Sequence, residues 1–531
     1  MKKVILLLIA SIACCGSFFA QQQSHWPDFN LYDYEQHGSL VACVKIDSNF
    51  VLGTDNYEDF EIGAFVNGTV RGHAFMDYFG NYGDLYPIVQ LEIYYDATAT
   101  DTGKEVAFKL YDHSTGHEYD ICTSLNPDTG SAYVTGEDCT KYPTSEDAGF
   151  LVLSFFTPTI TKTIEGYTEG SEEPDHYYLI ATPIGAVNPG DVANMTSNQY
   201  DLYSFDQNAA DGLQWINLRG SSDDLVTGMG YLYANSETVV LTFIGFAYEG
   251  SGEVTLSKNV ENNPGCEFEG WNLVGNPFTQ TAYITKPFYM MNEDGTEIIS
   301  GSGNSVEPME GIFVIADEDG EIMTFSTEEP DKRAALVMNI TQNRGRAIDR
   351  AIIRFGQEST LPKFMLNENN TKVYIPQDDK EYAVVTADKC GEIPVNFEAA
   401  QNGTYTFNIN AEKVDVKYLH LFDNMTGTDV DLLVNPSYTF NANANDYASR
   451  FKLVFATGKA TDGNFAFYSN GNFIINNEGE ATLQVVDVKG RILKSETIKG
   501  SASVSVNAAS GIYMLRLING NDVKVQKIMV E

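Results

Sequence analysis

Apolar and polar residues alternate with a period of two along most of this 531-residue chain, and helical periodicity is almost absent. Residues 60–66 and 69–75 alternate on either side of Asn67-Gly68, and residues 89–94 carry one apolar face. Because Asn-Gly supplies the two positive-φ residues of a tight turn, the first pair of runs predicts a β-hairpin. Short strands separated by turn residues predict an all-β chain organised as a string of β-sandwich domains.

The pattern divides the chain into five segments. At about one domain per ~150 residues, the roughly 510 residues that follow a leader suggest three or four domains. The expected segments are a signal peptide at 1–20, an N-terminal β-sandwich at 21–160, a duplicated β-domain at 161–330, a β-sandwich at 331–457 and a small β-sandwich at 458–531.

Segment 161–330 contains an internal duplication. Four apolar strands of its first half recur in the same order in the second half, displaced by 81–93 residues. One of them, an aromatic-led strand that ends in a small residue and proline, begins at Tyr177 and recurs at Gly270. Two similar units placed back to back predict pseudo-symmetric halves, each covering the apolar face of the other.

The last 73 residues, 459–531, form a separate module both by pattern and by charge. Alternating runs are interrupted by Lys489-Gly490 and Asn519-Gly520, which predicts a small antiparallel β-domain. The module carries eight Lys and Arg against seven Asp and Glu, whereas the whole chain has a net charge of −40. A near-neutral module at the end of a very acidic chain indicates a separate task.

This module resembles the C-terminal sorting domain, type A-like, of proteins exported by the type IX (Por) secretion system of Bacteroidota. The matching residues are Asp487 and Gly490 in VVDVKGRIL, Gly511 and Tyr513 in SGIYMLRL, and Lys527 in KVQKIMV. Where the family usually has a Pro-Asn-Pro-like entry, this chain has residues 472–477. The resemblance implies recognition by the type IX secretion machinery, commonly followed by removal of the tail and either attachment to lipopolysaccharide or release. The alternative is an ordinary terminal β-sandwich.

The N-terminus carries an export signature. Two lysines precede the apolar run 4–13, and a small-residue stretch ends at Ala20, before Gln21. A charged start and an apolar core too short to span a bilayer predict a secretory signal peptide cut between Ala20 and Gln21. Cys14 and Cys15 raise lipid attachment as an alternative, although the residues before them match its usual signal poorly. No other stretch approaches about 18 consecutive apolar residues, so we expect no transmembrane segment in the mature chain.

Five cysteines follow the signal peptide, and none forms a CxxC pair, which argues against zinc-ribbon and thioredoxin motifs. In an oxidising compartment Cys122 and Cys139 are the natural disulfide, closing a loop of 16 intervening residues. The chain-entropy treatment assigns such a loop about 3 kcal/mol of stabilisation. Because five is odd, at least one thiol is expected to be free or buried.

Charge and motifs narrow the function classes. With 73 Asp and Glu against 33 Lys and Arg, the chain would repel nucleic acid and anionic lipid, which we exclude as partners. A Gly-x-Ser-x-Gly elbow, His-Glu-x-x-His and a phosphate-binding glycine loop are missing. His113 and His117 have a spacing seen in metal sites, but we expect them at a hairpin tip without a third ligand. We therefore expect no catalytic residue, no metal and no cofactor.

Seven aromatic residues are candidates for an exposed platform that stacks on sugars or binds protein. The competing interpretation is a Tyr- and Phe-rich core, since aromatics are favoured in strands. The candidates are Tyr82, Tyr86, Tyr94, Tyr95, Trp215, Tyr231 and Tyr233.

The sequence thus predicts a non-enzymatic β-protein that is secreted by a Gram-negative bacterium or held on its outer-membrane surface. A first alternative is an adhesin for carbohydrate or a host protein, which a row of exposed aromatics on one sheet would favour. A second is a hydrolase with an interdomain site, which two carboxylates about 5–9 Å apart without ion-pair partners would favour.

Overall fold

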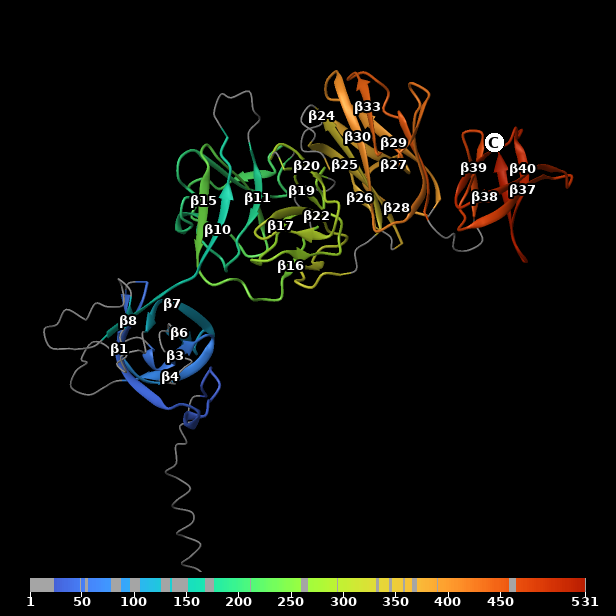
Figure 1. The fold of residues 1–531 in the computed structure, drawn as a ribbon. Helices are drawn as coiled ribbons and strands as arrows, with labels where there is room; N and C mark the ends of the chain where they lie inside the picture. Colours follow the sequence, from blue (N-terminus) through green and yellow to red (C-terminus); the bar gives the residue numbers. More distant parts are fainter. Residues whose placement is uncertain are drawn as a thin grey trace, which may run out of the picture. The chain divides into compact units, whose positions relative to one another are not determined.

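The computed structural model describes residues 23–530 with gaps, and every regular element longer than a single 3-10 turn in this part is a β-strand (Figure 1). The all-β prediction is confirmed. The same residues contain no helix with the length and apolarity to cross a membrane. The gaps are residues 48, 53–55, 78–86, 96–105, 126–133, 136–150, 168–175, 211, 259–265, 294, 331–333, 343–345, 357–358, 365–369, 389 and 458–464.

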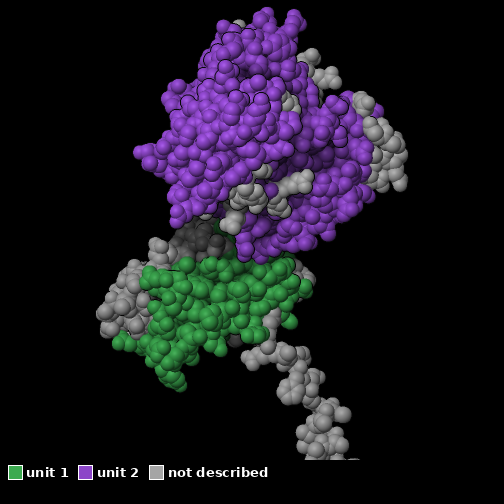
Figure 2. Space-filling model, turned by 90° about the vertical axis from the view of Figure 1, so that its right-hand side faces the viewer, with its two compact units in different colours: residues 1–159, 244–246 green, residues 160–243, 247–531 purple. Residues whose placement is uncertain are grey.

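The chain forms two compact units, coloured separately in Figure 2. Unit 1 comprises residues 1–159 with 244–246, and unit 2 comprises residues 160–243 with 247–531. The segment boundaries expected near residues 330 and 457 both fall inside unit 2 and remain predictions. The predicted signal peptide, with Ala20 and Gln21, lies outside the described residues and stays a prediction.

Unit 1 is built on one sheet of nine strands in the order β2-β1-β5-β4-β3-β6-β7-β8. Strand β9 pairs with both β1 and β7, so the sheet closes on itself around an apolar interior. The strands are β1 (Gln36–Ile46), β2 (Asn49–Phe50), β3 (Phe60–Val66), β4 (Thr69–Asp77), β5 (Ile88–Tyr95), β6 (Val106–Asp112), β7 (His117–Leu125), β8 (Val134–Thr135) and β9 (Leu151–Phe156).

The predicted hairpin joins β3 to β4. Asn67 and Gly68 have φ angles of 51° and 76°, the two positive values that a type I′ turn requires. Ile62 and Ala64 on one face of β3 are fully buried, together with Phe108 of β6 and Phe155 of β9. The alternation read from the sequence therefore sets which face of this hairpin enters the core.

The segment of Ser24 and His25 is tied to this sheet by Glu61 of β3, whose side chain is fully buried. Its Oε1 contacts Ser24 Oγ at 2.5 Å and His73 Nδ1 at 2.9 Å. Its Oε2 accepts a hydrogen bond from the His25 backbone N–H at 2.9 Å and contacts His113 Nε2 at 2.8 Å. Burial alone would raise the pKa of Glu61, but these hydrogen bonds outweigh it and lower the pKa to about 2.

Unit 2 begins with two halves that share one strand order. The first half has the sheet β11-β14-β12-β13, and the second has β17-β22-β19-β20. In both halves the first strand in sequence lies outside the four-stranded sheet and pairs with the last strand of that half: β10 pairs with β15, and β16 pairs with β23. The first-half strands are β10 (Thr159–Ile164), β11 (Tyr178–Ala181), β12 (Tyr200–Phe205), β13 (Trp215–Asn217), β14 (Gly230–Asn235) and β15 (Val239–Ile244).

The second half adds one pair of short strands, β18 with β21, to this common order. Its strands are β16 (Glu253–Thr255), β17 (Trp271–Gly275), β18 (Ala282–Tyr283), β19 (Tyr289–Met291), β20 (Ile298–Ser300), β21 (Ser305–Val306), β22 (Gly311–Ile315) and β23 (Ile322–Thr324).

The two halves do not cover one another alone. Leu179 of the first half and Phe313 of the second share a core with Ile352 and Phe364 of the region that follows. The expectation that each half covers the apolar face of the other leaves out this third region, which contributes to the same core.

That third region is an eleven-stranded arrangement in the order β32-β31-β34-β29-β27-β28-β25-β24-β30-β33, with β26 on β28. The strands are β24 (Ala335–Gln342), β25 (Ala347–Phe355), β26 (Leu361–Pro362), β27 (Lys372–Gln377), β28 (Lys380–Ala387), β29 (Cys390–Glu398), β30 (Gly403–Glu412), β31 (Val416–Asp423), β32 (Thr428–Asp431), β33 (Ser437–Ala442) and β34 (Phe451–Thr457).

The C-terminal module has two sheets, β35-β36-β39 and β38-β37-β40-β41, around its own apolar core. Its strands are β35 (Ala466–Ser469), β36 (Asn472–Ile475), β37 (Glu480–Asp487), β38 (Ile492–Lys499), β39 (Ala502–Ser505), β40 (Gly511–Asn519) and β41 (Asp522–Val530).

The Glu61 network generates a prediction. Substitution Glu61→Gln should destabilise unit 1 by about 1–3 kcal/mol at pH 7, since buried donors lose a charged acceptor. The lowered pKa contributes stability that is present above the ordinary glutamate value of 4.5 and is lost as the pH falls toward 2. The difference in unfolding free energy between variant and wild type should therefore shrink as the pH falls over this range.

Urea unfolding followed by the fluorescence of Trp26, buried beside this network, measures this difference. The exposed Glu58→Gln variant is the control and should match wild type.

Candidate functional site

The C-terminal module places Asp487 at the turn between β37 and β38. Its Oδ1 accepts hydrogen bonds from the backbone N–H groups of Lys489 and Arg491, both at 2.9 Å, and its Oδ2 from Arg491 Nε at 2.8 Å. These bonds, led by the Arg491 N–H, lower the pKa of Asp487. Gly490 follows with a φ of 79°, which favours glycine. The motif residues Asp487 and Gly490 therefore shape one turn.

The other motif residues lie on the hairpin of β40 and β41. Tyr513 is buried in the module core, and its hydroxyl donates to the Ala509 carbonyl at 2.8 Å. Gly511 begins β40, and Lys527 of β41 is exposed opposite Met514. The side-chain amide of Gln526 binds the backbone of Ala466 at 2.6–2.7 Å and so links the two sheets. These residues build a compact folded module.

The outward side of this hairpin exposes apolar side chains. Three apolar residues of β41 have 44–63% of their surface exposed, and Lys527 lies between two of them on the same face of the strand. We call this surface the outer face; it comprises Met514, Arg516, Val523, Val525, Lys527 and Met529. Exposed apolar surface with a polar surround is typical of protein-interaction sites.

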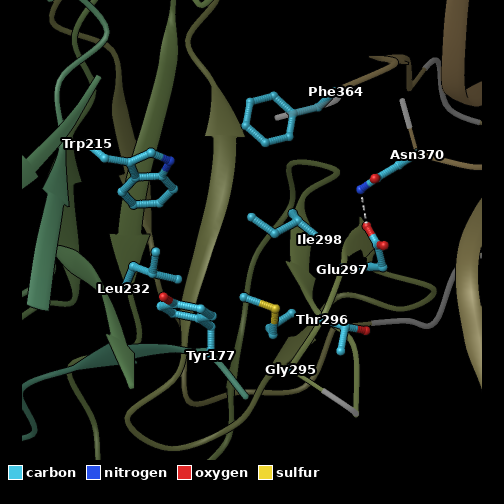
Figure 3. A pocket seen from close by; sticks show the side chains of 10 residues that line it. Tyr177, Trp215, Leu232, Gly295, Thr296, Glu297, Ile298, Phe364 and Asn370 are labelled. Atoms are coloured by element: carbon cyan, nitrogen blue, oxygen red, sulfur yellow. Dashed lines mark hydrogen bonds between the residues drawn. The ribbon is translucent and has the colours of Figure 1, made fainter. Parts of the chain in front are cut away.

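A pocket of about 250 Å³ lies in unit 2, where the duplicated region meets the third region (Figure 3). Trp215, Leu232 and Tyr177 lie on one side of it, and Glu297 and Asn370 lie on the other. Its remaining lining residues are Met291, Gly295, Thr296, Ile298 and Phe364. Aromatic walls with few polar groups are characteristic of ligand-binding pockets.

A close backbone approach holds the acidic side of the pocket in place. The backbone N–H of Tyr177 donates to the Gly295 carbonyl at 2.8 Å. Gly295 has a φ of 66°, and a Cβ there would lie 2.6 Å from the Tyr177 carbonyl oxygen. Only glycine fits both conditions, so this residue fixes the turn that presents Thr296 and Glu297.

The aromatic walls are supported from behind. Trp215 packs edge-to-face against Phe205 and Phe313, with ring centroids 5.3 and 5.9 Å apart. Phe364 packs against Trp271 and Phe313 at 4.6 and 4.9 Å. These contacts hold the rings in position before any ligand arrives, which reduces the entropy lost on binding.

Glu297 is the carboxylate of the pocket. Its Oε2 accepts a hydrogen bond from Asn370 Nδ2 at 2.6 Å. Partial burial, with a smaller contribution from Asp349, raises the pKa of Glu297 to about 7, although Asn370 and Lys363 act in the opposite direction. The described part of the chain supplies Glu297 with no ion-pair partner.

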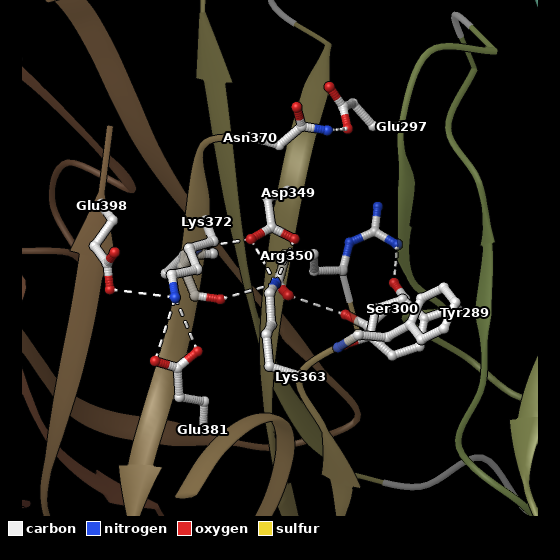
Figure 4. Close-up of polar contacts among 12 residues, drawn as sticks. Tyr289, Glu297, Ser300, Asp349, Arg350, Lys363, Asn370, Lys372, Glu381 and Glu398 are labelled. Carbon is white, nitrogen blue, oxygen red and sulfur yellow. Dashed lines mark hydrogen bonds and ion pairs between the residues drawn. The ribbon is translucent and has the colours of Figure 1, made fainter. Parts of the chain in front are cut away.

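A buried ion pair supports the chain around Phe364 and Asn370, between β26 and β27 (Figure 4). Asp349 of β25 accepts hydrogen bonds from Lys363 Nζ at 2.5 and 2.6 Å and from the Val373 backbone N–H at 2.6 Å. The Asp349 and Lys363 side chains are 4% and 2% exposed. The pair therefore fixes β25, β27 and the segment that follows β26 relative to one another.

Tyr289 of β19 connects the duplicated region to this segment. Its hydroxyl donates to the Pro362 carbonyl at 3.2 Å and accepts from the Phe364 N–H at 2.9 Å. Burial raises the pKa of Tyr289 well above its usual value, so the hydroxyl stays protonated. Ser300 and Arg350 exchange two further hydrogen bonds across the same boundary, at 3.0 and 2.7 Å.

The histidine pair considered as a metal site is separated in the structure. His113 contacts the buried Glu61, whereas His117 stacks on Phe246 with ring centroids 3.9 Å apart. The side chain of Asp112 is used by the hairpin tip, where it accepts hydrogen bonds from Ser114 and Thr115. No group of three or more metal-ligating side chains occurs among the described residues.

Among the described residues, the aromatic candidates do not gather on one exposed surface. Tyr231 and Tyr233 are buried in the core of the first half, and Trp215 lines the pocket. Tyr94 is half-buried, its ring packed against Phe29. Tyr82 and Tyr86 lie outside the described residues, as does the side chain of Tyr95. The disulfide between Cys122 and Cys139 stays a prediction for the same reason.

Three other cysteines are described as thiols. Burial raises the pKa of Cys43 to about 11 and also raises that of Cys390. Cys266 is buried and donates to the Gln207 carbonyl at 3.2 Å. Neither Cys43 nor Cys390 therefore carries an activated thiolate.

Comparison with known proteins identifies the C-terminal module. Residues 469–531 match the family of secretion system C-terminal sorting domains. A solved structure described as the BSP domain of a biofilm-associated protein aligns over 96% of this chain and 98% of its own, with 11% identity and a TM-score of 0.14. No curated protein matches the chain.

The Asp349–Lys363 pair generates a stability prediction. Asp349→Asn should destabilise unit 2 by about 3–5 kcal/mol, because it leaves a buried ammonium unpaired. Asp415→Asn removes a comparable but exposed pair with Lys417 and should cost about 0–1 kcal/mol. Chemical denaturation of the two variants measures the difference, and equal costs would contradict the structural role of the buried pair.

Glu297 generates a pH prediction. A raised carboxyl pKa opposes folding once the unfolded chain ionises, so stability is lost as the pH rises from about 4.5 to 7. Glu297→Gln should therefore stabilise unit 2 at pH 8, by about 1–2 kcal/mol after allowance for solvent screening, and leave it unchanged at pH 4. Thermal unfolding at both pH values measures this, and a gain of equal size at both would contradict it.

Proposed function

We propose that this chain, whose residues 469–531 are a type IX secretion system C-terminal sorting domain, is a non-enzymatic multidomain β-protein that acts outside the cell or on its outer-membrane surface. The match of the sorting domain carries the proposal, because that domain implies engagement of the type IX secretion machinery. The expected signal peptide, cut between Ala20 and Gln21, would take the chain across the inner membrane first.

The structure of the tail supports recognition as a folded unit. Its motif residues build one turn and one hairpin and do not lie in an extended peptide. The outer face adds an exposed apolar surface on a near-neutral module, whereas the rest of the chain is strongly acidic. A secretion component can therefore distinguish the tail from its cargo by shape and by charge. Removal of the tail with attachment to lipopolysaccharide, or release, would follow transport.

A binding role is our second candidate for the exported part. The aromatic pocket around Trp215 favours it, since its rings are positioned in advance and it carries a single carboxylate. Hydrolysis would require a second unpaired carboxylate at this site. Asp349 acts on Glu297 but is held by Lys363. An adhesin for carbohydrate or a host protein therefore fits this pocket better than a hydrolase.

Truncation tests the export role. A full-length chain should reach the cell surface or the medium, whereas a chain that ends at Thr457, the last residue of β34, should accumulate in the periplasm. Fractionation with detection by an antibody against unit 2 measures this. Arrival of both chains at the same place would show that the tail is only a structural domain.

Point variants separate recognition from loss of the whole module. Val525→Lys combined with Met529→Lys should lower surface delivery several-fold, because both side chains are exposed on the outer face. Lys499→Ala, at an exposed position outside this face, is the matched control and should be delivered like wild type. Normal delivery of the double variant would show that the secretion machinery does not recognise the outer face.

A further inference from the structure

We propose that the pocket between Trp215 and Glu297 binds an organic ammonium group, with aromatic rings around the alkyl substituents and the Glu297 carboxylate against the charge. This inference deepens the binding role offered above as the second candidate. It does not depend on export, because it concerns residues 177–370 and not the sorting domain.

The first argument is the state of the carboxylate. Glu297 is partly removed from water, and Asn370 Nδ2 is a neutral donor that occupies only Oε2. Holding a carboxylate away from water without a cation costs free energy. A cationic ligand would supply the missing partner and convert that cost into affinity, and the strong negative charge of the chain would attract it from a distance.

The second argument is the composition of the walls. Trp215, Phe364 and Tyr177 surround the hollow together with apolar side chains such as Leu232 and Met291 (Figure 3). Aromatic rings attract alkylammonium cations through their electron-rich faces, and tryptophan does so most strongly. The volume of about 250 Å³ suits one such group and excludes a larger ligand from full entry.

The third argument is that the polar groups of the pocket are largely engaged already. The Tyr177 hydroxyl donates to Asp201 Oδ2 at 3.2 Å, and the Thr296 hydroxyl accepts from Asn292 Nδ2 at 3.2 Å. The Asn370 amide donates to Glu297. A sugar ring needs several donors and acceptors to replace its lost water, whereas an alkylammonium group needs only the carboxylate and the rings.

The charge of Glu297 makes the interaction dependent on pH. The groups that act on it are Asp349 of β25 and Lys363 after β26, with Asn370 beside them and Tyr177 across the pocket. Lys363 is occupied by Asp349 and cannot serve as the counter-ion. Because the pKa of Glu297 is about 7, the carboxylate is mostly ionised at pH 8 and mostly protonated at pH 6. Affinity for a cation should fall across this range.

The test uses the purified mature chain, residues 21–531, with choline as the ligand and 3,3-dimethylbutan-1-ol as its neutral isostere. Calorimetric titration at pH 8 should show saturable choline binding at least about tenfold tighter than binding of the isostere, since only choline carries the charge that the rings and Glu297 attract. A peptide with an Nε-trimethyllysine should compete, and whether it binds more or less tightly than choline indicates a protein or a small-molecule source.

Matched variants assign the binding to this pocket. Glu297→Gln should weaken choline at least about tenfold at pH 8 and remove the decrease between pH 8 and 6. Trp215→Leu should weaken it similarly, and Trp215→Phe should retain part of the affinity. Tyr447→Leu, an exposed aromatic outside the pocket, is the control and should bind like wild type. Circular dichroism spectra that superimpose on wild type, with one cooperative thermal transition in each variant, show that the fold is retained, whatever the shift of the midpoint.

Three results would overturn the proposal. They are equal affinity for choline and its neutral isostere, choline binding that Glu297→Gln leaves unchanged, and binding of methyl glycosides without binding of choline. The last result would leave the binding role standing with a carbohydrate as its ligand. Absence of binding by every compound would overturn the ammonium site and leave the export role untouched.

Discussion

The buried ion pair between Asp349 and Lys363 is the constraint on which the interior of unit 2 depends. Two charges with almost no exposure to water are tolerated only with full hydrogen bonding, and Asp349 achieves this by also accepting from the Val373 N–H. The pair thereby fixes the segment after β26, which carries Phe364 into the aromatic core shared with the duplicated region. Removing either partner would leave a buried charge without its counter-ion, and the segment after β26 would no longer be held in place.

The same segment explains why a pocket exists at this place. Tyr289 holds Phe364 from the side of the duplicated region, while Gly295 lets the turn that carries Glu297 approach Tyr177. Each region alone presents only part of the wall. The pocket is therefore a consequence of how the third region caps the duplicated halves, whose own apolar faces would otherwise remain partly uncovered.

The chain separates transport from whatever the exported part does. The sorting domain has its own core and its own charge balance, and its motif residues stabilise a turn and a hairpin. The interior of unit 2 relies on other contacts, the Asp349–Lys363 pair and the Tyr289 hydroxyl. Transport and ligand recognition can therefore change independently, since they draw on different residues.

The sequence by itself determined the strands, the internal duplication and the identity of the tail. These features depend on alternation, on turn residues and on motifs within a few tens of residues, where local sterics and burial act directly. Trp215 was a candidate from its side chain alone, but Glu297, Phe364 and Asn370 were not found. Only the tertiary structure brings these residues together with Trp215 in one pocket. It also places His113 against Glu61, whereas His117 contacts Phe246. Contacts between residues 52 and 73 positions apart, such as His113 with Glu61 and Asn370 with Glu297, follow from packing between sheets, which no local pattern encodes.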